Sequence, residues 1–126
     1  NSMNHIVLIG RLVADPVLRY TQSGVAVTSF TLAVDRNRSK EDGQRETDFI
    51  DIVTWRKLAE TCANHLNKGR LVAVSGRLQI RRYDDKDGIR RKAAEVVADR
   101  VQFLDRAKQD GAEQASDWGS GDDAPF

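Results

Sequence analysis

Apolar and polar residues alternate along much of this chain, and the alternation predicts β-strands. Within residues 25–34, the large side chains of Phe30, Leu32 and Val34 alternate with Ser29, Thr31 and Ala33. In residues 47–55 two sets of side chains alternate in the same way, Phe49, Asp51, Val53 and Trp55 against Ile50, Ile52 and Thr54. Both segments therefore have the period of a strand. Residues 5–13 and 71–80 are more continuously apolar, and a single glycine interrupts each of them. We expect buried strands that bend at the glycine, and residues 93–104 predict a fifth, long strand.

One segment has the period of a helix instead. Leu58, Cys62 and Leu66 recur every four residues, and Lys68-Gly69 supplies a cation and a glycine stop. These features predict a helix at roughly residues 56–67. Cys62 falls on its buried side, where we expect an inert thiol that packs as a small hydrophobic residue.

Turn-forming residues separate the predicted elements. Asp15-Pro16 and Gln22-Ser23-Gly24 bound a predicted loop. Residues 35–46 contain no apolar side chain and form a long charged connection around Gly43. Residues 84–88 predict a hairpin tip, because Asp-Gly is a strong short turn signal.

The order of elements is three strands, one helix and two strands, with bends at Gly10 and Gly76. This order predicts an all-β fold, a five-stranded Greek-key barrel of the OB type with one α-helix between strands 3 and 4. A five-stranded sandwich fragment is the alternative. In OB barrels the sheet face and the connections between strands are the usual ligand sites.

The net charge of +1 conceals two regions of opposite sign. Residues 1–106 carry 19 Lys and Arg against 14 Asp and Glu, which gives +5, whereas residues 107–126 carry one Lys against five acids, which gives −4. A basic body suits a polyanionic ligand. The single cysteine favours a reducing, intracellular setting, and no run is long and apolar enough to predict a membrane span or a signal peptide.

Four regions are predicted along the chain. Residues 1–2, ahead of Met3, are expected to be a cloning remnant; residues 3–106 form the folded domain; residues 107–121 form a flexible, disordered linker. The acidic tip of this tail consists of Asp122, Asp123, Ala124, Pro125 and Phe126. A polar tail that ends in this way predicts a hook for partner proteins, because a terminal carboxylate and one side chain are a known recognition signal. A ragged end with an accidental Phe is the alternative.

The residue pattern does not favour catalysis or metal binding. His5 lies on a predicted strand and His65 in the helix, and neither has the surroundings of a catalytic base. The single cysteine and the two separated histidines lack the spacing of metal ligands. Asp48 and Asp51 fall on opposite faces of a strand, and there is no glycine-rich phosphate loop. We therefore expect no enzymatic activity, no metal and no cofactor.

Cations and aromatic residues alternate in a way that favours nucleic-acid binding. Phe49, Trp55 and Tyr83 each stand next to a charged residue and are candidate platforms for unpaired bases, because sequence-tolerant single-strand binding combines ring faces with a basic groove. The cations expected to meet phosphates are Arg36, Arg38, Lys40, Arg56, Lys57, Arg81, Arg82, Arg90, Arg91 and Lys92. The alternatives are that Phe49 and Trp55 face the core and that the cations form a solvated rim.

Several stretches resemble the bacterial single-stranded DNA-binding protein family. They are Met3-Asn4, Val7 to Leu12, Asp15-Pro16, Arg19-Tyr20, Thr31 to Ala33, Trp55 to Glu60, Lys68-Gly69, Gly76 to Leu78 and the acidic Pro-Phe end. The ordered set is highly specific. The resemblance implies an OB fold, assembled as a homotetramer, that binds and protects single-stranded DNA without sequence preference. It also implies a cytoplasmic, nucleoid-associated protein whose tip recruits replication, recombination and repair proteins.

Carried over by position, the stacking aromatics of the family fall on Phe49, Trp55 and Tyr83. A further stacking tryptophan of some members falls near Arg38, which would offer its guanidinium plane instead. The tip has fewer consecutive acids than is usual in the family and the linker is short, which suits a main protein or an accessory paralogue. The alternative classes are an RNA-binding OB module that prefers the 2′-OH and a primosome-type accessory protein that binds DNA more weakly.

Overall fold

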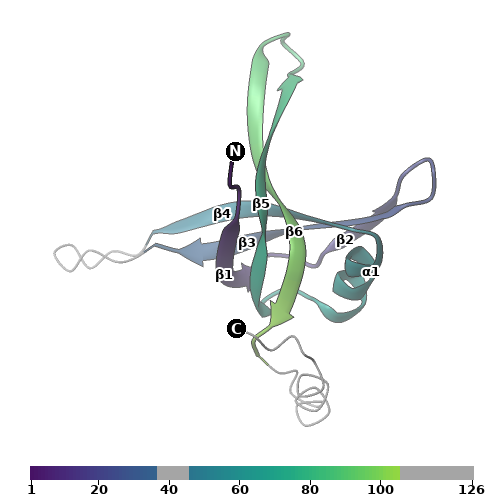
Figure 1. The fold of residues 1–126 in the computed structure, drawn as a ribbon, viewed down its shortest axis with the longest axis vertical. Coiled ribbons are helices and arrows are strands. Elements are labelled where there is room, and N and C mark those ends of the chain that lie inside the picture. The colour runs from purple at the N-terminus through teal and green to yellow at the C-terminus, as the bar shows by residue number, and fades with distance from the viewer. Residues whose placement is uncertain (37–45, 106–126) are drawn as a thin grey trace, which may run out of the picture.

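The computed structural model describes residues 1–36 and 46–105. Within them the chain forms six strands and one helix (Figure 1). In chain order these are β1 (Ile6–Leu12), β2 (Val17–Tyr20), β3 (Ala26–Asp35), β4 (Thr47–Trp55), α1 (Arg56–His65), β5 (Leu71–Asp84) and β6 (Arg90–Phe103).

Five of the strands close into a ring. The hydrogen-bonded order is β1-β5-β6-β4-β3, and a further pairing of β1 with β3 completes the circle. All neighbours in the ring are antiparallel except β4 and β6, which are parallel over Asp51 to Val53. The predicted OB barrel, with its single helix between the third and fourth predicted strands, is confirmed, and the sandwich fragment is not formed.

Strand β2 occupies part of the segment for which the sequence predicts a loop. Val17–Tyr20 pairs antiparallel with Ala26–Ser29 of β3, while β1 pairs with β3 further along, at Ala33 and Leu32. Strands β1 and β2 therefore lie along the same edge of β3. The predicted turn residues fall at the ends of β2, where Gly24 has a φ of 86°.

The predicted bends lie at Gly10 and Gly76. At Gly10 and Arg11, strand β1 passes from pairing with β5 to pairing with β3, and a Cβ on Gly10 would collide with the backbone of Ala33. At Gly76 the register of β5 and β6 shifts, and a Cβ there would collide with the backbone of Val97 and Ala98. Both positions therefore require glycine because another strand passes directly over them.

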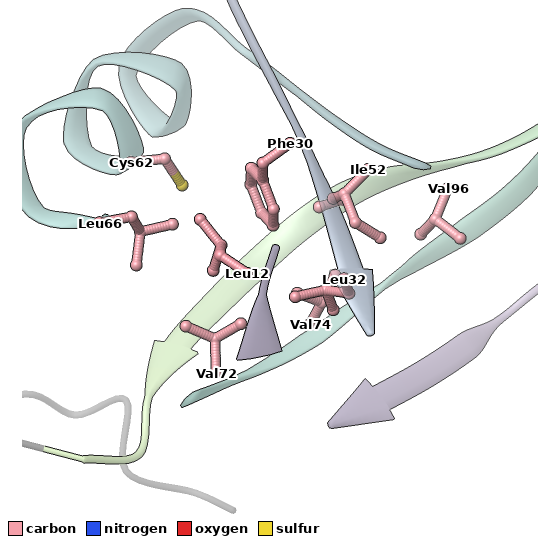
Figure 2. Packing of buried hydrophobic residues seen from close by; sticks show 10 residues of the cluster. Leu12, Phe30, Leu32, Ile52, Cys62, Leu66, Val72, Val74 and Val96 are labelled. Atoms are coloured by element: carbon pink, nitrogen blue, oxygen red, sulfur yellow. The ribbon is translucent and has the colours of Figure 1, made fainter. Parts of the chain in front are cut away.

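The core lies inside the barrel and is covered at one end by α1. Figure 2 shows Cys62 and Leu66 directed from the helix region toward Leu12 and Phe30, and all four side chains are buried. Buried hydrogen bonds add to this packing: Thr28 Oγ1 donates to Ala59 O at 2.7 Å, and Thr54 Oγ1 donates to Thr28 O at 3.0 Å. The helix is therefore fixed to the sheet by both apolar and polar contacts.

Strands β5 and β6 extend beyond the barrel as a long hairpin (Figure 1). Strand β5 last pairs with β1 at Gly76, and β6 first pairs with β4 at Glu95. Residues 79–84 and 90–94 of the two strands therefore pair only with each other in the described structure, and we call residues 79–94 the β5–β6 arm. At its tip Gly88 has a φ of 78°, as the predicted Asp-Gly turn requires.

Candidate nucleic-acid interface

Strand β4 carries two aromatic rings on the outer face of the barrel. Ile52 and Thr54 are fully buried, whereas Phe49 is 67% and Trp55 42% exposed. The period of two along a strand places Phe49 and Trp55 on the same face, about 20 Å apart at roughly 3.3 Å per residue. Neither ring faces the core, so that alternative is wrong.

Tyr83 belongs to the same face, although it lies on another strand. Asp51 of β4 is paired in register with Glu95 of β6, and Glu95 is paired with Gln79 of β5. Paired residues point to the same side of a sheet, and Tyr83 lies four positions beyond Gln79, so it follows on that side. Its ring is 42% exposed, and the guanidinium carbon of Arg81 lies 5.6 Å from the ring centroid.

A groove of about 520 Å³ lies on this face, over β2, β3, β4, β5 and β6. Polar contacts occur within its lining: Thr31 Oγ1 donates to Asp51 Oδ1 at 3.0 Å, and Arg81 Nε lies 3.7 Å from Glu95 Oε1. The groove is lined by Val13, Ala14, Asp15, Val17, Arg19, Val27, Ser29, Phe30, Thr31, Asp51, Val53, Arg81 and Glu95. None of the three rings is among these lining residues, although all three are exposed on the same sheet face.

The chain turns sharply directly after Trp55. Arg56 has a φ of 61°, a left-handed conformation that a residue other than glycine adopts at a cost of order 1–3 kcal/mol. Helix α1 starts at this point, with no side-chain hydrogen bond at Trp55 to cap it. Arg56 and Lys57 are exposed, and within the described residues neither has an acidic partner. Two exposed cations therefore directly follow Trp55 in the chain.

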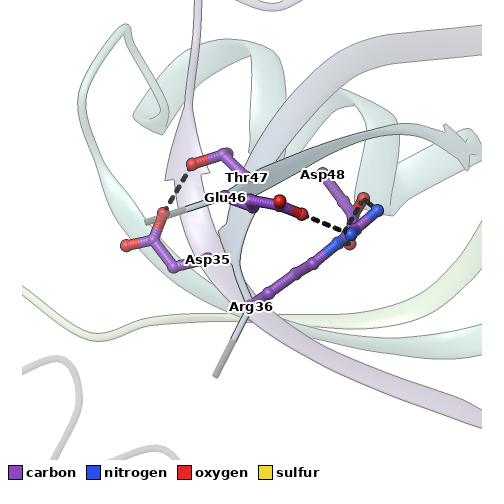
Figure 3. Close-up of polar contacts among 5 residues, drawn as sticks. All are labelled: Asp35, Arg36, Glu46, Thr47 and Asp48. Carbon is purple, nitrogen blue, oxygen red and sulfur yellow. Dashed lines mark hydrogen bonds and ion pairs between the residues drawn. The ribbon is translucent and has the colours of Figure 1, made fainter. Parts of the chain in front are cut away.

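Arg36, by contrast, is held between two carboxylates (Figure 3). Its guanidinium donates to both Asp48 oxygens at 2.9 to 3.2 Å and to Glu46 Oε1 at 2.6 Å. The hydrogen bonds from Arg36 lower the pKa of the Asp48 carboxyl. Among the described residues at this end of the β3–β4 hairpin, the charge of Arg36 is thus already balanced by Glu46 and Asp48.

Two arginines of the β5–β6 arm are also paired. Arg90 Nε donates to Asp84 Oδ1 at 2.9 Å, and Arg91 Nε donates to Asp85 Oδ2 at 2.7 Å. Asp85 also accepts the backbone N–H groups of residues 87 and 89. The hydrogen bond from Arg91, followed by that from the backbone of Ile89, lowers the pKa of the Asp85 carboxyl. These contacts hold the tip of the arm together.

The ten cations predicted to meet phosphates thus differ in whether a carboxylate lies close to them. Arg36, Arg81, Arg90 and Arg91 lie near carboxylates, and Arg38 and Lys40 lie outside the described residues, as does the tip 122–126. In the described structure no ion pair involves the remaining four, which are Arg56, Lys57, Arg82 and Lys92.

Sequence reasoning missed Arg19 and the pairing of Asp51 with Glu95 in the lining of the groove. Arg19 lies on β2, in a segment for which the sequence predicts a loop, and lines the groove beside Val17 and Val27. The only signal for it in the sequence is the isolated dipeptide Arg19-Tyr20. Asp51 and Glu95 lie 44 positions apart in the sequence but become neighbours through the parallel pairing of β4 and β6. That pairing is not encoded in a local pattern.

Within residues 1–36 and 46–105, no three His, Cys, Asp or Glu side chains gather as metal ligands would. Cys62 is fully buried, and burial raises the pKa of its thiol to about 12, which agrees with the predicted inert thiol. The one described helix, α1, is too short and polar to cross a bilayer.

Comparison with known proteins gives the family of this chain. The model of the single-strand binding protein family matches residues 3–104. A single-stranded DNA-binding protein of Caldanaerobacter subterraneus subsp. tengcongensis is 61% identical over 103 residues, which are 82% of this chain and 69% of that protein. Single-stranded DNA-binding protein 3 of Clostridium acetobutylicum is 55% identical over 116 residues, or 91% and 80% of the two chains. A single-stranded DNA-binding protein of Halalkalibacterium halodurans is 50% identical over 121 residues, or 94% and 72%. The chain belongs to the single-strand binding protein family.

Proposed function

We propose that this protein binds single-stranded DNA without sequence preference along the outer face of its barrel. The observation that carries the proposal is that Phe49, Trp55 and Tyr83, from two different strands, are exposed on the groove side of one sheet. Burying hydrophobic rings is the usual outcome of folding, so three open rings on one face favour a ligand with flat apolar faces. The names of the similar proteins support the same ligand.

In this proposal the bases stack on the rings and the phosphates meet cations at the rim. Stacking contributes about 1–3 kcal/mol per base and does not depend on which base is present, because every base has a π-face. Arg56 and Lys57 stand directly after Trp55 in the chain, whereas Arg82, next to Tyr83, lies on the opposite face of β5. A DNA strand that stacks on Trp55 therefore meets a segment with two cations that have no acidic partner among the described residues.

The direct test is a comparison of nucleic acids. Fluorescence anisotropy with oligo-dT, a mixed DNA sequence, the same sequence as RNA, and duplex DNA measures affinity for each. We expect similar affinities for the two single-stranded DNAs, weaker binding of duplex, and a steep loss of affinity with added salt. A clear preference for RNA would replace this proposal with the RNA-binding module, which reads the 2′-OH.

We also propose that the protein assembles as a homotetramer. Val7 and Ile9 of β1 are 50% and 55% exposed, and Leu78 and Ile80 of β5 are 42% and 46% exposed. Apolar side chains left in water on neighbouring strands favour a contact with further copies of the chain. Sedimentation equilibrium measures the assembly, and a monomer at micromolar concentration would contradict it.

Finally, we propose that the tip, residues 122–126, recruits replication, recombination and repair proteins to DNA at the nucleoid. The support is chemical: two carboxylates, a proline and a terminal phenylalanine suit a basic pocket with an apolar cleft. Deletion of Pro125-Phe126 is expected to abolish pull-down of such proteins while oligo-dT affinity stays the same or rises slightly. Unchanged recovery of partners would refute the role of the tip.

A further inference from the structure

A carboxylate lies on the outer face of β4 between its two exposed rings. Asp51 is exposed and shares the face of Phe49 and Trp55, because residues two and four positions apart in a strand point to the same side. At roughly 3.3 Å per residue, Asp51 lies about 7 Å along the strand from Phe49 and about 13 Å from Trp55. A DNA strand that stacks on both rings therefore has to pass over an anion.

The charge of Asp51 is not balanced by its neighbours. The hydroxyl of Thr31, which donates to Asp51 Oδ1 at 3.0 Å, is neutral. Across the sheet Asp51 is paired with Thr31 and Glu95, and along β4 its neighbours on the same face are Phe49 and Val53. None of these four is a cation, and among the described residues no ion pair involves Asp51.

The lining of the groove as a whole is slightly acidic. It contains three carboxylates against two guanidinium groups, a sum of −1: Asp15, Asp51 and Glu95 against Arg19 and Arg81. Arg81 already lies close to Glu95. Arg19 is paired with Val27, which is paired with Trp55, so Arg19 is level with Trp55 and not with Asp51. The middle of this face is therefore an unfavourable place for a phosphate.

We propose that Asp51 is a specificity-determining residue that keeps phosphates away from the middle of this face and so selects strands that carry bases. The inference rests on the proposed function and adds what that function discriminates against. A strand whose bases stack on the rings holds its phosphates about one base away from the carboxylate. A polyanion without bases can present only phosphates there, and like charges brought together disfavour a wrong partner.

A matched pair of variants tests the role of Asp51. Asp51→Asn removes the charge but keeps an oxygen that can accept the Thr31 hydroxyl. Glu60→Gln is the control, because it removes one carboxylate from an exposed position on α1 that does not line the groove. Fluorescence anisotropy measures the affinity of each folded variant for oligo-dT and for an abasic deoxyribose-phosphate strand of the same length. The salt concentration is about 0.1 M, where charges are screened over about 10 Å.

Asp51→Asn is expected to raise affinity for the abasic strand about fivefold, which is the effect of two unit charges about 4 Å apart in water. Affinity for oligo-dT should rise by no more than about twofold, because phosphates held a base away are largely screened. Glu60→Gln should leave the ratio of the two affinities unchanged.

Three results would overturn the inference: an unchanged affinity of Asp51→Asn for the abasic strand, an equal gain for both strands, or the same change of ratio in Glu60→Gln. If the wild-type protein did not bind oligo-dT, the proposed function itself would fail, and this outcome is distinct from the other three.

Discussion

Trp55→Ala tests the stacking surface most directly. The ring is 42% exposed in the free protein, so it is open to a base before any rearrangement. Loss of one stacking platform is expected to weaken binding by about 1–3 kcal/mol, which corresponds to about 5- to 140-fold in affinity. The salt slope should stay the same, because the substitution removes no cation that neutralises a phosphate.

The substitution also affects the fold, and the assay has to allow for this. Truncating a fully buried aromatic residue costs about 3–5 kcal/mol, and Trp55 is only partly buried, so we expect about 2 kcal/mol. Affinity for oligo-dT is therefore measured by anisotropy at 25 °C, after circular dichroism has shown that the variant is folded. Trp55→Phe keeps an apolar ring and should retain most of the affinity.

Tyr20→Ala is the matched control. Tyr20 is also an exposed ring, at 61%, but it is paired with the buried Ala26 and thus lies on the side of β2 away from the groove. Its removal should not change affinity. Native affinity in a folded Trp55→Ala protein would remove that ring from the interface, and an equal loss in Tyr20→Ala would show that the face does not matter.

Two further predictions concern the barrel itself. Gly76→Ala should lower the free energy of unfolding by about 3 kcal/mol, since the new Cβ meets the backbone of Val97 and Ala98. Gly24→Ala places its Cβ with nothing within 4 Å, so it should lower the free energy of unfolding by only about 1 kcal/mol, because of its positive φ. Urea melts measure both variants, and equal losses would contradict the steric argument. Burial raises the pKa of the Cys62 thiol from 9.0 to about 12, so the folded state holds this proton more tightly than the unfolded state. The free energy of unfolding should then fall as the pH rises from 9 toward 12, and a thiol reagent at pH 8 should label Cys62 only after unfolding; rapid labelling of the folded protein would show that the thiol is not sealed.

The strands with alternating residues were predictable from sequence, because their burial is set locally. In β4, Ile52 is buried and Phe49 exposed: the period of two places them on opposite faces, and the charged Asp51 shares the face of Phe49. Arg82 and Tyr83 are adjacent in one strand, so they point to opposite faces of the β5–β6 arm. This arrangement also follows from the sequence once the hairpin turn is recognised.

The remainder depends on long-range pairing that no local pattern reports. All four residues of β2 are exposed, so the strand has no buried face to reveal it, and it exists through its register with β3. The ion pair of Arg36 with Asp48 joins residues 12 positions apart. Sequence therefore identified the cations but not which of them are already neutralised, since that depends on which strands meet.

The ring of strands has a consequence for how this protein is made. Strand β1, at the beginning of the domain, pairs with β5, and β5 pairs with β6 as far as Phe103. The barrel therefore cannot close on the ribosome until nearly the whole domain has emerged from the exit tunnel. Until then the nascent chain shows unpaired strand edges and apolar side chains, the features that chaperones and proteases recognise. Because the barrel closes late in synthesis, the pairing of β6, rather than of the first strands, is the step that commits the polypeptide to its native state.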